Sequence, residues 1–196
     1  LHHKYLGHLN LYNERTVPLY SRINTYLFPE VSRLIKKDAV FNFGGYMSPQ
    51  AAYMQILGLE TLDVRYSRQA QTALEIARRL ESVPEVLAVG YPGLESHPNH
   101  EIFRKLYGEN AGAMVTFDLA DAGECFKFID SLKLIHRATN LFDNRTLAIH
   151  PASTIFGPLA EAERKAMDVK DTTIRLSIGL ENVEDIWGDI SQSLGK

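Results

Sequence analysis

The polar segment at residues 134–155 concentrates the side chains of this sequence that are best suited to chemistry. Short apolar runs bound it at both ends, and between them lie amide, carboxylate, guanidinium, imidazole and hydroxyl groups: Asn140, Asp143, Asn144, Arg145, His150, Ser153 and Thr154. Proteins often place binding groups on loops that regular elements hold in position. The same composition suits a solvated connection, so both interpretations stay open at this point.

Arg175 is the most unusual charge in the sequence because it lies inside an apolar stretch, residues 174–178. It alternates with Ser177, so both side chains should share one face of a strand. A guanidinium can form two parallel bonds to a carboxylate, which a lysine cannot copy. Arginines in strands are more often solvent-facing, so the pattern alone favours a solvated residue over a partly buried carboxylate site.

Two other groups of reactive side chains have simpler explanations. Cys125 lies within a predicted helix, where a small buried hydrophobic residue is commoner than a nucleophile. His2, His3 and His8 could form a metal cluster, but they lack a further ligand at helical or finger spacing. We therefore expect a flexible terminus or a tag remnant there rather than a metal site.

The first half of the sequence predicts mainly helix. Apolar spacing indicates an amphipathic helix over residues 18–37, interrupted at Pro29. A helix-breaking segment with paired glycines follows at residues 42–46. Ser48 and Pro49 have the residue types of an N-cap and a first helical position. A long helix should run from there to about Glu81, bent near Gly58. Its arginines should form a solvated or oligomer-facing side: Arg65, Arg68, Arg78 and Arg79.

The second half alternates single strands with helices. Strands are predicted at residues 86–89 (buried), at 113–119, starting at 134–135, and at 173–178, the last ended by Gly179. Helices are predicted at residues 100–106, 122–132, 159–167 and 182–194. The inward side chains should be Cys125, Phe126, Phe128, Ile129 and Leu132 in the second of these helices, and Val183, Ile186, Trp187 and Ile190 in the last. This order indicates an α/β or α+β fold.

Composition excludes several classes of protein. A net charge of −3 and an isoelectric point near 6.2 give no support for binding to nucleic acid or to an anionic membrane. No apolar run approaches the roughly 18 residues of a membrane span, and no signal peptide opens the chain. A single cysteine fits a reducing cytoplasm. The chain begins with Leu1 rather than Met, which suits a fragment or a processed product.

Six motifs in register resemble one enzyme family. They lie at residues 48–49, 58–62, 91–98, 131–134, 150–153 and 175–179, and residues 181–185 continue the last of them. Across residues 38–194 their order and spacing are similar to the C-terminal domain of the Cys/Met-metabolism family of pyridoxal-phosphate enzymes, which includes cystathionine γ-synthase, methionine γ-lyase and O-acetylhomoserine sulfhydrylase. The resemblance implies an α/β (α+β sandwich) domain of fold type I, with helices covering a small sheet. It divides the chain into an N-terminal connecting segment, residues 1–40, and a substrate-carboxylate domain, residues 41–196.

The resemblance also implies roles for individual residues. Arg175 would grip the α-carboxylate of an amino-acid substrate, and Asn140 would help to orient that carboxylate and the cofactor-bound imine. Asn140 and residues 91–98 are most similar to the O-acetylhomoserine sulfhydrylase branch. Where the family has a small Gly-Asp pair, this sequence has Phe142-Asp143. We interpret His150 and Ser153 as structural, a His-Pro turn and a capping hydroxyl, rather than catalytic.

The cofactor implied by the resemblance is pyridoxal 5′-phosphate, which a lysine imine holds and which acts as an electron sink. Residues 3–8 resemble the family's Lys-Tyr-x-x-Gly-His, with Lys4 as the lysine, but the match is one residue short. The favoured alternative is that residues 1–20 follow the true lysine. No residue of this chain is expected to be catalytic, and its cofactor-binding residues are unknown.

Two functions follow as hypotheses. The favoured one is the C-terminal portion of a lyase or transferase of sulfur amino-acid metabolism, such as a sulfhydrylase, γ-lyase or γ-synthase. It would bind a small amino acid, work with a missing N-terminal half or a neighbouring subunit, and form a cytoplasmic homo-oligomer, as the tetramers of the family do. The alternative is a stand-alone, non-catalytic interaction domain without a complete cofactor site.

Overall fold

The computed structural model describes residues 47–195. The described residues divide into two units between residues 57 and 58. The domain boundary expected at residues 40 and 41 lies outside the described residues. The helix predicted at residues 18–37 and the helix-breaking segment predicted at residues 42–46 also lie outside the described residues.

Five short strands form one mixed sheet in the order β1-β2-β5-β4-β3. Their bounds are β1 Ala88–Gly90, β2 Met114–Asp118, β3 His136–Arg137, β4 Leu147–Ile149 and β5 Thr173–Ser177. All neighbours are antiparallel except β3 and β4, which are parallel. The central strand, β5, therefore pairs with both β2 and β4, and it carries Arg175 and Ser177.

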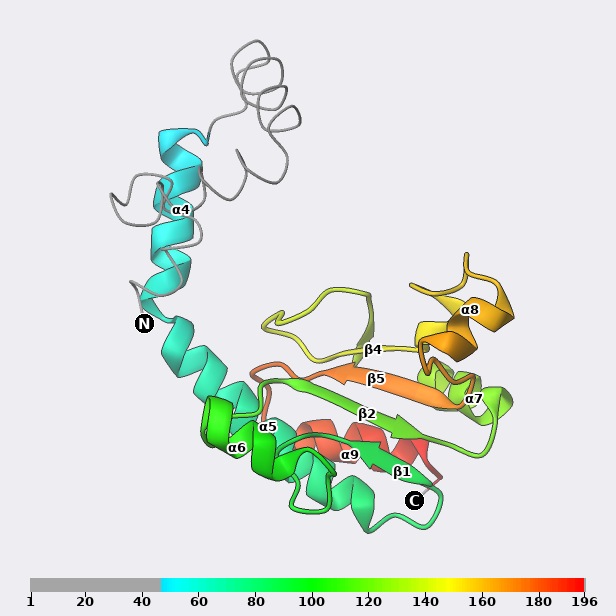
Figure 1. The fold of residues 1–196 in the computed structure, drawn as a ribbon. Helices are drawn as coiled ribbons and strands as arrows, with labels where there is room; N and C mark the ends of the chain where they lie inside the picture. Colours follow the sequence, from blue (N-terminus) through cyan, green and yellow to red (C-terminus); the bar gives the residue numbers. More distant parts are fainter. Residues whose placement is uncertain (1–46, 196) are drawn as a thin grey trace, which may run out of the picture. The chain divides into compact units, whose positions relative to one another are not determined.

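The described helices are α4 Pro49–Glu60, α5 Leu62–Glu81, α6 His100–Tyr107, α7 Ala122–Ser131, α8 Glu161–Ala166 and α9 Val183–Ser193, with a 3-10 turn, η2, at Pro151–Ser153. Of these, α5 contacts β1 and β2, and α7 contacts β5, as expected for an α/β domain with a small covered sheet. Figure 1 shows α5 and α9 together along one face of the sheet. No helix in the described part of the chain is long and apolar enough to cross a bilayer.

The core lies between this helical layer and one face of the sheet. Ile174 and Leu176 of β5 are fully buried there, beside Val115 of β2. Ile76 and Leu80 of α5 close the core from the helix side. Burying a side chain of this size stabilises the fold by about 1.5–3 kcal/mol. Because strand residues alternate between faces, burial of Ile174 and Leu176 leaves Arg175 and Ser177 on the other face.

The helix start at Ser48 is confirmed, but the interruption of the long helix is not where it was predicted. The Ser48 hydroxyl accepts a bond from the Ala51 N–H at 3.1 Å, as an N-cap should. The break falls at Thr61 instead of near Gly58. The Arg65 guanidinium donates to the Gly58 carbonyl at 2.5 Å, and its Nε donates to Thr61 Oγ1 at 3.2 Å. The side chain thus satisfies a carbonyl at the end of α4.

Three further predictions are corrected by the structure. The strand predicted as buried at residues 86–89 is the edge strand β1 at Ala88–Gly90. Among residues 47–195 it pairs only with β2, and Leu87 before it is 67% exposed. Phe126, predicted to point inward, is 46% exposed and lies edge-on to His150 at 5.0 Å between ring centroids. The strand predicted to start at residues 134–135 is β3, which starts at His136, and β4 was not predicted.

Arg79 of α5 links this helix to α9 through hydrogen-bonded ion pairs, whereas it was predicted to be a solvated charge. Its guanidinium donates to both oxygens of Glu184 on α9, at 2.9 and 2.6 Å, and to Glu75 on α5 at 2.8 Å. It also lies 5.7 Å from the Trp187 ring centroid. Hydrogen bonds to the two carboxylates raise the pKa of Arg79. Arg68 and Arg78 are exposed, as expected.

The thiol of Cys125 is expected to be unreactive in the folded protein. The side chain is fully buried and lies 3.2 Å from the Thr172 carbonyl, and burial raises the pKa of the thiol to about 11. Since only the thiolate reacts, labelling at pH 8 should proceed only on unfolding. The free energy of unfolding should fall as pH rises from about 9 towards 11, because the unfolded thiol ionises first. Rapid labelling of native protein at pH 8 would contradict this.

Candidate functional site: an arginine with an unpaired Nε on the central strand

Arg175 is held at the sheet face by one backbone contact. Its Nη2 donates to the Thr139 carbonyl at 2.9 Å. Its Nε is buried and has no hydrogen-bond partner. The side chain is half-buried, and loss of hydration lowers the pKa of the guanidinium. The pattern alone favoured a solvated arginine; the structure instead places it partly inside the protein.

No acidic side chain among residues 47–195 forms an ion pair with Arg175. A buried donor without an acceptor costs about 1–3 kcal/mol, and more when the group is charged. Binding of an acceptor at this site would remove that cost and is therefore favourable. A carboxylate matches the guanidinium fork in charge and in geometry.

The second predicted residue, Asn140, lies next to the contact that holds Arg175. It follows Thr139 in the connection between β3 and β4, the yellow-green loop above β5 in Figure 1. Its side chain is exposed, and within the described part of the chain no residue bonds to it. The structure thus brings Arg175 and the backbone of this loop together, and leaves the Asn140 amide available at the same end of the loop.

A second tether on β5 holds the same connection, which we call the carboxylate loop, residues 138–145. The Phe142 N–H donates to Ser177 Oγ at 3.1 Å. Ser177 is only 1% exposed. Because Arg175 and Ser177 share one face of β5, the two tethers lie two residues apart on the same strand.

The far end of the carboxylate loop is closed by Glu181 and Gly179. Both oxygens of Glu181 accept bonds from Thr146, one from its N–H at 2.7 Å and one from its hydroxyl at 2.8 Å. The Thr146 hydroxyl in turn accepts from the Gly179 N–H at 2.9 Å. A Cβ on Gly179 would lie 2.5 Å from the backbone of Arg145 and Thr146. Glycine at this position therefore reflects close backbone approach.

His150 and Ser153 have the structural role that was predicted. His150 is 3% exposed, and its Nε2 lies 2.8 Å from the Asp171 carbonyl. Since that carbonyl can only accept, Nε2 carries the proton and Nδ1 accepts from the Ser153 hydroxyl at 2.9 Å. Both ring nitrogens are thus engaged inside the protein, which leaves neither free to act on a substrate.

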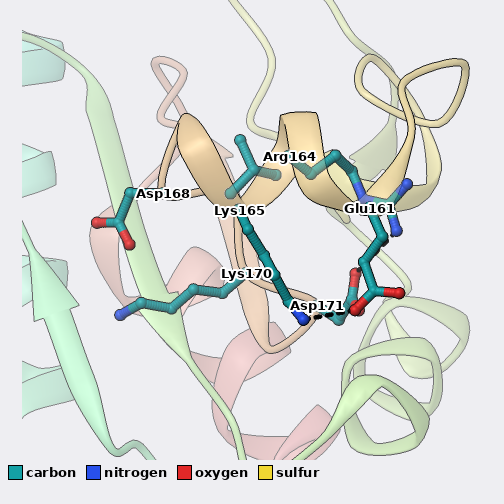
Figure 2. A pocket seen from close by; sticks show the side chains of 7 residues that line it. Glu161, Arg164, Lys165, Asp168, Lys170 and Asp171 are labelled. Carbon is teal, nitrogen blue, oxygen red and sulfur yellow. Dashed lines mark ion pairs between the residues drawn. The ribbon is translucent and has the colours of Figure 1, made fainter.

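A charged depression beside α8 is separate from these contacts. Figure 2 shows its lining, which comes from α8 and the segment after it: Glu161, Arg164, Lys165, Asp168, Val169, Lys170 and Asp171. Its cations already have partners. Lys165 pairs with Glu161 at 2.6 Å, and Lys170 pairs with Asp118 at 2.9 Å. We interpret it as a surface of ion pairs, which contribute little individually.

Comparison with known proteins decides the family. The model of the Cys/Met metabolism PLP-dependent enzymes matches residues 25–195. The chain belongs to this family. It is 42% identical over 154 residues to an L-methionine γ-lyase of Fusobacterium nucleatum, covering 78% of this chain and 39% of that protein. It is 39% identical over 173 residues to O-acetyl-L-homoserine sulfhydrylase 1 of Thermus thermophilus, covering 87% of this chain and 41% of that protein.

A solved structure supports the same family assignment. A Campylobacter jejuni protein assigned as an O-acetylhomoserine (thiol)-lyase superposes with a TM-score of 0.77 at 36% identity, over 84% of this chain and 39% of that one. The fold is thus that of fold type I pyridoxal-phosphate enzymes. The chain spans about two fifths of the length of these Cys/Met-metabolism relatives. The Campylobacter structure carries a pyridoxyl-lysine phosphate.

The described residues of this Cys/Met-metabolism chain fit a substrate carboxylate better than the cofactor itself. Every lysine between residues 47 and 195 is exposed, so none offers a sheltered amine for an imine. Lys4, the lysine considered for that role, lies outside the described residues, as do His2, His3 and His8. Among the described residues no group of histidine, cysteine or acidic side chains could hold a metal ion.

Sequence reasoning missed Gln69, Thr146 and Glu181 as residues that shape the site. Glu181 and Gly179 belong to the motif at residues 175–185. The spacing of that motif indicates the family but does not indicate contacts of these two residues with the loop. Gln69 sits on α5, 109 positions before its partner Ile178. The one signal in the sequence for a role of Gln69 was that a polar residue lies among the apolar residues on the buried side of α5.

Proposed function

We propose that this chain supplies the α-carboxylate site of a pyridoxal-phosphate enzyme that acts on homoserine- or cysteine-type amino acids. The observation that carries the proposal is the buried, partnerless Nε of Arg175. A carboxylate would complete the guanidinium fork, while Nη2 keeps its bond to the Thr139 carbonyl. Asn140 would help to orient the same carboxylate from the loop.

The chemical step itself would depend on residues outside the described part. Pyridoxal phosphate, when bound, supplies an electron sink for cleavage at the carbons of the amino acid. Because the described lysines are all exposed, the groups that hold the cofactor would come from the rest of the protein or from a neighbouring subunit. The described residues contribute binding and orientation, which can account for several kcal/mol of a barrier. We further propose a cytoplasmic homo-oligomer, as expected for this family.

A non-catalytic interaction domain is the second candidate. The observation that favours it is the same exposure of every described lysine, which leaves residues 47–195 without a cofactor site of their own. It gives no reason, however, for the desolvated guanidinium of Arg175. That difference makes the first candidate the stronger one.

Absorbance spectroscopy separates the two functions. The complete protein, mixed with pyridoxal phosphate, is expected to show a visible absorbance band from the protein-bound cofactor. The band should change when a homoserine- or cysteine-type amino acid is added, because the amino acid would bind at the cofactor. A Lys4→Ala variant tests Lys4 directly; we expect it to keep the band. Absence of any band in the complete protein would favour the interaction domain, and loss of the band in Lys4→Ala would assign the cofactor lysine.

A further inference from the structure

Phe142 adopts a backbone conformation that bulky residues avoid. Its φ is +55°, in the left-handed region. Glycine takes this conformation freely, whereas a residue with a Cβ is strained there unless its surroundings hold it. In this chain other contacts must therefore hold Phe142 in place.

The first contact is an aromatic stack with α5. The Phe142 and Tyr66 rings lie 6.1 Å apart between centroids, at an interplanar angle of 20°. The Tyr66 hydroxyl is fixed by a 2.8 Å bond to the Asn110 carbonyl. Both rings lie over Gly112, where an added Cβ would meet Phe142 Cζ at 3.6 Å and Tyr66 Cε2 at 3.9 Å. The stack thus has a fixed base.

The second contact is a buried amide on the same helix. Gln69 is 2% exposed, and its Nε2 donates to the Asp143 carbonyl at 2.8 Å and to the Ile178 carbonyl at 3.0 Å. Tyr66 and Gln69 are three positions apart, so they project from one face of α5. One face of α5 therefore holds two consecutive loop residues, Phe142 and Asp143, while Ser177 holds the Phe142 N–H from β5.

We propose that Tyr66 and Gln69 are positioning residues for the carboxylate loop. By holding Phe142 in its left-handed conformation, they keep the Thr139 carbonyl against Arg175 and keep Asn140 beside it. Substrate affinity would then depend on side chains of α5 that do not touch the substrate. The inference rests on the proposed function of Arg175 and deepens it.

Hydrogen exchange of the complete protein, read by mass spectrometry, tests the structural half. Tyr66→Leu removes the stack and should speed exchange at the Phe142 N–H and at the Leu180 N–H, which donates to the Asn144 carbonyl, by about tenfold or more. Adding Phe142→Gly should restore protection, since glycine needs no support at positive φ. Unchanged exchange in Tyr66→Leu, or no rescue by the glycine, would overturn the inference.

Kinetics of the same variants test the functional half. Tyr66→Leu should raise KM for the amino-acid substrate by about tenfold with kcat within about threefold, as expected when ground-state binding is lost. The matched control is Tyr107→Leu, which breaks a similar stack with Phe103, 5.9 Å and 21°, on α6; it should leave KM unchanged. If Tyr66→Leu proves unstable, Gln69→Leu carries the same test.

The outcomes separate this inference from the proposed function. If Arg175→Lys raises KM and Tyr66→Leu does not, positioning by α5 is wrong and the carboxylate site stands. If neither variant raises KM, the carboxylate site itself is wrong. The exchange measurement is independent of activity, so it decides the loop contacts in either case.

Discussion

Replacing Arg175 with alanine should lower kcat/KM for the amino-acid substrate of the complete protein by about 30- to 4,000-fold, equivalent to about 2–5 kcal/mol. The substrate carboxylate would lose its charged fork inside a partly desolvated site. Arg175→Lys keeps the charge but cannot form the two parallel bonds, so most of the loss should remain. Steady-state kinetics on purified, cofactor-loaded protein measures both effects.

Stability measurements distinguish a lost binding group from a damaged fold. Removing Arg175 relieves the cost of its desolvated, unpaired Nε but loses the bond from Nη2 to the Thr139 carbonyl. Because these two effects oppose each other, the free energy of unfolding should change by less than about 1 kcal/mol. Arg78→Ala, at an exposed position on α5, serves as the control and should leave both kinetics and stability unchanged. Wild-type kcat/KM in Arg175→Ala would refute the carboxylate site.

Replacing Asp189 with alanine should destabilise the fold by about 3–5 kcal/mol. Asp189 on α9 is 7% exposed, and its carboxylate accepts from three consecutive backbone N–H groups at 2.8–2.9 Å: Lys133, Leu134 and Ile135. Gln192 donates to it as well, at 3.0 Å. Without the carboxylate these donors, of which the Ile135 N–H is buried and the other two are partly buried, would lose their acceptor. Denaturant unfolding gives the change directly.

Two variants on α9 calibrate that measurement. Asp189→Asn keeps one oxygen acceptor and should lose a smaller part of the stability. Asp185→Ala removes an exposed carboxylate from the first turn of the same helix and should cost less than about 1 kcal/mol. Equal losses in Asp185→Ala and Asp189→Ala would show that the three N–H bonds contribute no special stability.

The alternation of residues 173–178 was enough to predict β5 almost to its ends and to place Arg175 and Ser177 on one face. The N-cap at Ser48 and the end of the long helix at Glu81 were also predictable, because periodicity and capping are local signals. The exposure of the edge strand β1 could not be predicted, because the position of a strand in a sheet depends on which strands pair with it.

The contacts that shape the site could not be predicted, because they join distant positions without a periodic pattern. Glu181 meets Thr146 across 35 residues, and Asp189 meets Ile135 across 54. Phe142 shows the limit most clearly. The sequence places a bulky residue at position 142, but only the backbone shows the positive φ that Tyr66 and Ser177 stabilise.

The most direct test of the carboxylate site compares a substrate amino acid with the amine that lacks its carboxyl group. Affinities of both for the cofactor-loaded protein would be measured in wild type and in Arg175→Ala. Wild type should prefer the amino acid by about 100-fold or more, and the variant should lose all but about fivefold of that preference. An undiminished preference in Arg175→Ala would contradict the assignment of Arg175 as the carboxylate-binding residue.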